Sequence, residues 1–208
     1  MLDVHAPEHG IHGVRDFFVH LLTITAGLLI AIALEQSVEA LHHRHQRKEA
    51  EAMIRQELSE NRDEITQRQE KLTTEVSDLV GLLAYIDERL AHKPADASKL
   101  HLGLSEGPLR DAAWRTAAAT GVATYMDYAT VERFAECYKE QDEYELVQGH
   151  AVEAFLGIVS FAAVKKPAEL SDDELRAAQP SVRQALAHLQ ALRDIGRGAV
   201  KMYDEALK

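Results

Sequence analysis

The sequence predicts an all-α fold: a single N-terminal transmembrane helix continues into a long rod helix, which is packed by an antiparallel helical bundle. Residues 17–34 contain no formally charged side chain and are mostly apolar, as expected for a membrane-crossing helix of about 17–25 residues. No proline interrupts residues 15–91, so one helix can continue through them. Ala, Leu, Glu and Arg are abundant, and all four favour helix.

The apolar segment is better explained as a retained anchor than as a cleaved signal peptide. The residues before it include Asp3, Glu8 and Asp16 against the single basic Arg15, whereas a signal peptide begins with a basic region. A buried core helix fits less well, because the segment is apolar on every face. The predicted organisation is a flexible tail (1–14), a transmembrane helix (15–40), a juxtamembrane stalk (41–57) and a helical bundle domain (58–208).

Basic residues flanking the anchor indicate its orientation. Arg15 stands alone before it, whereas Arg44, Arg47, Lys48 and Arg55 follow it. Because the side richer in Lys and Arg faces the cytoplasm, we expect the bundle domain to be cytoplasmic. A periplasmic bundle is the alternative, since Arg15 lies close to the membrane.

Within the anchor, small or polar residues recur every four positions. They are Thr23, Gly27, Ala31 and Glu35. This spacing places them along one slowly rotating helix face, where small residues let membrane helices pack closely. We expect this face to form a homo-oligomer interface, although such spacings also arise by chance. In an oligomer, a ring of Glu35 side chains could bind cations or line a pore.

The run after the anchor is rich in histidine. Glu39-x-x-His42 has the spacing used in helical di-metal sites, and His43 and His45 follow it. A complete site needs more ligands, and the nearest second motif is the reversed His150-x-x-Glu153, so a metal would have to be shared between chains. The alternative is an interfacial anchor in which Arg44, Arg47 and Lys48 meet anionic lipid headgroups. His5, His9 and His12 add a further weak metal-binding or pH-sensing candidate in the tail.

Beyond residue 54 a seven-residue repeat predicts a helix packed on other helices. One apolar seam runs along the first position of the repeat, and a second seam, apolar only in its later part, lies four residues further on. The first seam comprises Leu58, Ile65, Leu72, Leu79 and Ile86, and the second comprises Arg62, Gln69, Val76, Leu83 and Leu90.

The remaining elements follow from turn and cap residues. Prolines and glycines mark residues 92–108 as a loop. We expect a small-residue helix over 109–120 that is stopped by Gly121, and a helix over 127–164 that is capped by Asp127. The polar stretch near 139–145 would allow a bend or break in this helix. A last helix begins at the capping box of Ser171 and Glu174, with a kink or a break at Pro180.

Composition and motifs exclude several classes of function. The net charge of −11 and the lack of a long basic run outside the juxtamembrane segment argue against nucleic-acid binding. Cys137, the only cysteine, lies between Glu136 and Glu140, and nearby acids disfavour a reactive thiolate. No catalytic motif is present, so we expect a protein that is not an enzyme. Trp114 is either part of a ligand pocket with Arg110 and Arg115 or a packing anchor.

Two segments, LLTITAGLLIAIALEQSVEALHHRH and AAWRTAAATGVATYMDYATVERFAECYKEQ, resemble a family of uncharacterised bacterial proteins. These have one N-terminal membrane helix ending in Leu-Glu, a histidine-rich juxtamembrane run and a helical domain. The resemblance implies a bacterial inner-membrane location and suggests that Glu35, His42, His43 and His45 matter, but it implies no activity or cofactor.

The function expected is that of an oligomeric, membrane-tethered scaffold or sensor that presents its helical domain to a protein partner. One alternative is an ion-conducting or transport assembly with Glu35 at the pore. The other is a metal-binding protein that uses the juxtamembrane Glu and His residues.

Overall fold

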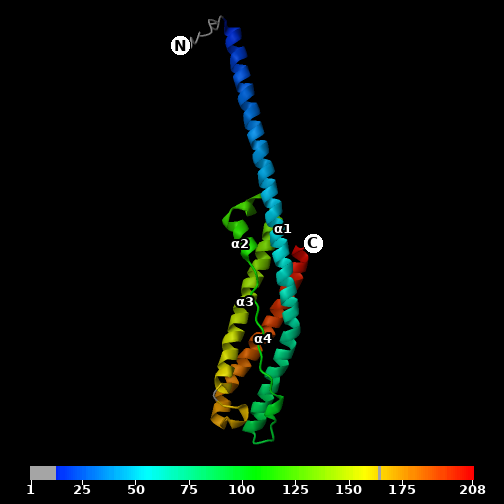
Figure 1. Cartoon of the computed structure of the whole chain (residues 1–208), viewed down its shortest axis with the longest axis vertical. Helices are drawn as coiled ribbons and strands as arrows, with labels where there is room; N and C mark the ends of the chain where they lie inside the picture. The colour runs from blue at the N-terminus through cyan, green and yellow to red at the C-terminus, as the bar shows by residue number, and fades with distance from the viewer. Residues whose placement is uncertain (1–12, 164) are drawn as a thin grey trace, which may run out of the picture. The chain divides into compact units, whose positions relative to one another are not determined.

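The computed structural model describes residues 13–163 and 165–208, and within them the chain is all-helical without strands (Figure 1). The four α-helices are α1 (Val14–Leu90), α2 (Ala112–Ala119), α3 (Tyr128–Ala162) and α4 (Asp172–Ala206). Short 3-10 helices cover Ala97–Lys99, Val122–Tyr125 and Pro167–Glu169. The predicted all-α fold is therefore confirmed. The chain divides into two compact units, residues 1–48 and 49–208, and α1 belongs to both.

The described part of the first unit is the N-terminal part of α1. Its apolar side chains, among them Phe17, Leu22 and Leu29, are exposed, and no part of the most apolar 18-residue window is buried. A helix in the core of a soluble protein would be covered by other elements, whereas this one is not. By length and composition, α1 could cross a membrane.

The second unit packs α1 against α3 and α4. Glu57 and Asn61 of α1 contact Tyr138 and Gln141 of α3 in ascending order, so α1 and α3 run in the same direction. They do so because the chain leaves α1 at Leu90 and returns through a largely extended segment before it enters α2 and α3 (Figure 1).

The last helix runs the other way. Arg62 of α1 contacts Asp204 of α4, whereas Asp87, seven turns later, contacts Gln179. α4 is thus antiparallel to α1, and Figure 1 shows it returning along α3 as well. In the bundle, α1 and α3 therefore run in the same direction, and α4 runs antiparallel to both.

The first heptad seam forms the core, as predicted. Each of its five side chains is at most 2% exposed. The second seam lies beside it: its apolar members Val76, Leu83 and Leu90 are partly buried and pack against the core, and its polar members are half-buried. A further flank, which was not predicted, is buried three residues after the first seam and carries Asn61, Arg68, Glu75 and Leu82. Polar residues fill this flank because the extended segment before α2 lies on it and needs hydrogen-bond partners for its backbone.

Capping residues begin α3 and α4 where the sequence predicted. The Asp127 side chain accepts a hydrogen bond from the Thr130 N–H, and Ser171 and Glu174 form the capping box. Gly121 follows the end of α2 with a φ of 75°, in the left-handed region that favours glycine.

Neither of the two helix breaks considered from the sequence occurs in the described helices. α3 continues through residues 139–145, and α4 continues through Pro180. A single proline removes one backbone N–H donor from a helix, and buried side chains on both sides of Pro180, such as Leu175 and Val182, keep α4 in contact with the core. The expected break at Pro180 is therefore wrong.

Candidate functional site

The residues expected to form an oligomer interface lie on the exposed apolar part of α1. Thr23, Gly27, Ala31 and Glu35 are all exposed in the single chain. The Thr23 hydroxyl donates to the Val19 carbonyl at 2.9 Å, so its polar group is satisfied within the helix. A Cβ placed on Gly27 would meet no atom within 4 Å. This face is thus sterically open to a neighbouring helix.

The juxtamembrane Glu and His side chains form a pair rather than a metal site in the single chain. Glu39 Oε1 lies 3.9 Å from His43 Nε2, while the rings of His42 and His43 are 6.4 Å apart. Over residues 13–163 and 165–208, no group of three or more His, Cys, Asp or Glu side chains is arranged to hold a metal ion. His45 is exposed. The tail histidines His5, His9 and His12 lie outside the described residues.

The basic residues proposed to meet lipid headgroups differ in exposure. Arg44 and Lys48 are exposed, whereas Arg47 is half-buried. Arg44 and Lys48 therefore have the access to solvent that a headgroup contact requires.

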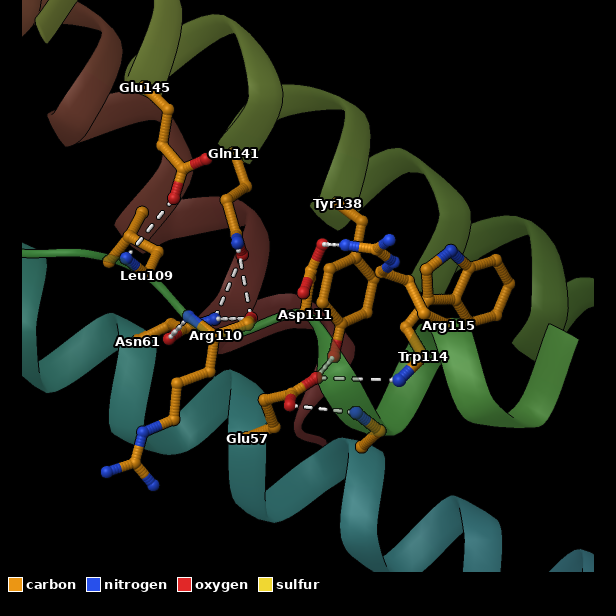
Figure 2. Close-up of polar contacts among 11 residues, drawn as sticks. Glu57, Asn61, Leu109, Arg110, Asp111, Trp114, Arg115, Tyr138, Gln141 and Glu145 are labelled. Atoms are coloured by element: carbon orange, nitrogen blue, oxygen red, sulfur yellow. Dashed lines mark hydrogen bonds and ion pairs between the residues drawn. The ribbon is translucent and has the colours of Figure 1, made fainter. Parts of the chain in front are cut away.

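A buried polar network in the second unit, shown in Figure 2, was not predicted. Side chains from α1 and α3 bind the backbone of residues 109–114, which lead into α2. We call this set the polar clamp, and it comprises Glu57, Asn61, Tyr138, Gln141 and Glu145.

Glu57 holds the start of α2. Its carboxylate accepts hydrogen bonds from the Ala113 N–H at 2.9 Å, the Trp114 N–H at 3.5 Å and the Tyr138 hydroxyl at 2.6 Å. Asp111, at the N-cap position, makes no side-chain capping bond. Glu57 therefore caps α2 from another helix, where a negative charge also favours the helix N-terminus.

Tyr138 is buried between these elements. Burial, together with its hydrogen bond to the Glu57 carboxylate, raises the pKa of the Tyr138 hydroxyl above its ordinary value. The hydroxyl therefore keeps its proton and acts as a donor to Glu57 at neutral pH.

Asn61 and Gln141 hold the residue before α2. Asn61 Nδ2 donates to the Arg110 carbonyl at 2.7 Å, and the Arg110 N–H donates to Asn61 Oδ1 at 2.8 Å. Gln141 Nε2 donates to the same carbonyl at 3.2 Å, and its Oε1 accepts from Asn61 and from the Tyr203 hydroxyl. The network thus joins α1, α3 and α4 to one backbone position.

The clamp continues through the neighbouring residues. The Leu109 N–H donates to Glu145 Oε1 at 3.2 Å. Burial raises the pKa of Glu145, and this hydrogen bond partly offsets the rise.

Further along α1, Arg68 and Glu75 bind the extended segment in the same way. The Arg68 guanidinium, 2% exposed, donates from Nη2 to the Ser105 carbonyl. The Ser105 N–H donates to Glu75 Oε1 at 2.7 Å. The polar flank of α1 is therefore a continuous docking track for the segment that returns to α2.

Trp114 packs on the clamp. Its indole stacks on the Tyr138 ring with centroids 5.6 Å apart and an interplanar angle of 9°. Arg115 pairs with Asp111 at 3.3 Å, and Arg110 pairs with Glu60. Arg110 thus engages an acid on α1 and Arg115 an acid at the α2 N-cap. Figure 2 shows Trp114 of α2 against Tyr138 of α3, which anchors α2 to α3.

A shallow cleft lies beside the clamp, between α1 and α2. Its volume is about 250 Å³, and its lining includes Met53, Gln56, Glu60 and Thr116. Sites for drug-sized ligands are usually larger, about 300–1,000 Å³. Cys137 does not line this cleft: it is buried on α3, and burial raises the pKa of its thiol to about 12, which disfavours the reactive thiolate. The side chains of this region instead bind the backbone of residues 109–114, which lead into α2.

The clamp escaped prediction because its residues are polar at core positions. One sequence signal indicates the flank of α1 to which Asn61 belongs: Ile54, Asn61, Arg68, Glu75 and Leu82 follow one another at steps of seven. This series does not include Glu57 or the members of the clamp on α3. In the comparisons with known proteins, the chain matches no family model, no curated protein and no solved structure.

Proposed function

We propose that this protein is a homo-oligomeric scaffold or sensor, tethered to a bacterial inner membrane, which presents its helical bundle to a protein partner. The observation that supports the tether is the apolar part of α1, of which the most apolar window is entirely uncovered. An exposed apolar surface of this size is not stable in water. A bilayer solvates it, and α1 then continues into the unit that holds the bundle.

The open face at Thr23, Gly27 and Ala31 supports self-association. Its side chains are small, and Gly27 has free space around it, so a second helix can approach closely. Glu35 is exposed on the same α1 face and would be shared between chains. Van der Waals packing along this face would drive the assembly, because lipid competes poorly with a close-fitting helix surface.

A pair of matched substitutions tests this face. Ala31→Leu and Ala33→Leu add the same side chain to exposed positions that lie about 200° apart around the helix. Light scattering of the full chain in detergent, at several protein concentrations, should show an oligomer for the unsubstituted protein and for Ala33→Leu. Ala31→Leu should shift the protein towards the monomer. A strictly monomeric unsubstituted protein, or equal behaviour of the two variants, would contradict the interface.

The cytoplasmic orientation is tested with reporters joined after Lys208. A fluorescent protein that matures only in the cytoplasm should fluoresce there, and alkaline phosphatase, which is active only in the periplasm, should be inactive. The physical basis is the excess of basic residues after the apolar segment, including the exposed Arg44 and Lys48. The opposite pair of results would place the bundle in the periplasm.

The second candidate is an ion-conducting assembly, favoured by the position of Glu35 four residues after Ala31 on the open face. A ring of carboxylates at the end of a span would attract cations. In liposomes, Glu35→Gln should then lower cation flux relative to the unsubstituted protein. Absence of flux with both proteins would exclude this candidate and leave the scaffold proposal untouched.

A further inference from the structure

A histidine pair bridges α3 and α4 on the surface of the bundle, away from the polar clamp. His150 of α3 and His188 of α4 have ring centroids 5.5 Å apart, with an interplanar angle of 49°. His150 is exposed and His188 is half-buried, so solvent reaches both rings.

The packing of the two helices places this pair at the edge of an open cleft. One end of the cleft lies near Gly157, where a Cβ would come within 3.1 Å of Ser181 Oγ; this close approach brings α3 and α4 together. His150 lies seven residues before Gly157 and His188 seven residues after Ser181, so the antiparallel helices present both histidines at the same level. The cleft has a volume of about 420 Å³ and is lined by His150, Glu153, Ala154, Ser181, Gln184 and His188.

We propose that this cleft is a binding site for a divalent transition-metal ion of the zinc class, held by His150 and His188 and completed by Glu153 and water. Two imidazoles that share a tetrahedral zinc ion, with Zn–N distances of about 2.0–2.1 Å, have ring centroids about 5 Å apart. The observed separation is close to this value. Imidazole and carboxylate ligands together suit zinc, copper and nickel.

The two histidines and Glu153 are not arranged as a three-ligand group in the metal-free chain, so Glu153 must move to become the third ligand, and its place on α3 allows this. It lies one turn after His150 and lines the same cleft, so rotation of its exposed side chain brings a carboxylate towards the two rings. This site differs from the juxtamembrane Glu39 and His42 candidate, because its ligands come from two helices. A metal bound here therefore cross-links α3 to α4.

The cross-link provides the test. The full chain, purified in detergent without a histidine tag and stripped with a chelator, is titrated with Zn²⁺ while thermal unfolding is followed by circular dichroism. Metal that binds the folded state preferentially raises Tm. We expect a saturable rise for the unsubstituted protein, no rise for His150→Gln or His188→Gln, and a retained rise for His188→Cys, which keeps a metal ligand.

His101→Gln is the matched control, since His101 is an exposed histidine in the segment before α2, and its rise should equal that of the unsubstituted protein. The urea midpoints of all variants without metal should agree, because the two cleft histidines are not in the core. Absence of a zinc-dependent rise in the unsubstituted protein would overturn the proposal. An undiminished rise in His150→Gln and His188→Gln would also overturn it, because the metal would then bind elsewhere.

Discussion

Asn61 and Arg110 form a closed pair of hydrogen bonds: the Asn61 amide donates to the Arg110 carbonyl at 2.7 Å and accepts from the Arg110 N–H at 2.8 Å. The two residues are 49 positions apart, and Asn61 is 2% exposed. The amide therefore satisfies both backbone groups of a residue that belongs to no helix or strand.

Replacing Asn61 by leucine tests whether apolar burial or backbone hydrogen bonding contributes more to stability at this position. Leucine would make this flank of α1 apolar and would suit a heptad seam, but it would leave the Arg110 N–H without its partner. We expect Asn61→Leu to lower the free energy of unfolding by roughly 1–3 kcal/mol, the usual cost of a buried unsatisfied group. Urea unfolding of the detergent-solubilised protein measures it, with the exposed Gln67→Leu as control. A stabilised Asn61→Leu protein would show that apolar burial outweighs the hydrogen bonds.

Removing the Glu57 carboxylate should release α2 from α1. Glu57→Ala leaves the Ala113 N–H, the Trp114 N–H and the buried Tyr138 hydroxyl without their acceptor, at a cost of roughly 1–3 kcal/mol. Trp114 is the only tryptophan, so its fluorescence reports on α2 directly. We expect a red-shifted emission and faster quenching by acrylamide in Glu57→Ala, but not in Glu70→Ala, whose side chain on α1 is exposed. Unchanged fluorescence in Glu57→Ala would mean that Trp114 stacking alone holds α2.

The heptad positions of α1 show how much of the fold the sequence predicts. Leu58, Ile65 and Leu72 are apolar, regularly spaced and buried, so periodicity alone identifies them. The capping residues Asp127 and Ser171 act within their own helices, and local sequence is sufficient for them.

The polar clamp lies beyond such reasoning because its contacts are remote in sequence. Glu57 and Tyr138 are 81 residues apart, and neither has a neighbour in the sequence that indicates its partner. A lone Glu or Asn on a helix is most often solvated. The sequence therefore places Glu57 in the juxtamembrane stalk and gives no reason to place Asn61 in a site. Only the path of the returning segment explains why polar side chains occupy this flank of α1.

Alkaline pH should unfold the bundle through its buried tyrosines. Burial raises the pKa values of Tyr138, Tyr144 and Tyr203 above the ordinary value, which is about 10. Above that pH the unfolded chain releases protons that the folded chain retains, so the stability present below about pH 10 is lost as the pH rises further.

Alkaline unfolding through the buried tyrosines can be checked by following tyrosine ionisation and helix content in the same pH titration. Tyrosinate absorbance in the near ultraviolet and helical circular dichroism should change in the same alkaline transition for the buried tyrosines. Tyr203→Phe, which removes one of the three groups, should make the urea midpoint less dependent on pH in this range. Ionisation of all tyrosines without loss of helix would contradict the burial of these hydroxyls.

Two glycines of α4 should respond oppositely to the same substitution. A Cβ on Gly196 would clash with Gln69 Nε2 and would lie 3.1 Å from Tyr144 Cε2 and 3.3 Å from Ile65 Cγ2. Gln69 is a flexible side chain, but Tyr144 and Ile65 are fully buried and have no room to move. At Gly198 the nearest atom, Glu140 Oε1, would be at an ordinary 3.5 Å.

We therefore expect Gly196→Ala to lower the free energy of unfolding by roughly 1–3 kcal/mol, the usual cost of overpacking a core. Gly198→Ala should raise it by up to about 1 kcal/mol, because alanine is the better helix former. Urea unfolding of both variants measures the difference, and helix propensity cancels between them. Equal stabilisation by the two substitutions would show that α4 can move away from α1 and α3 at Gly196 at little cost, and that the core at Tyr144 is not closely packed.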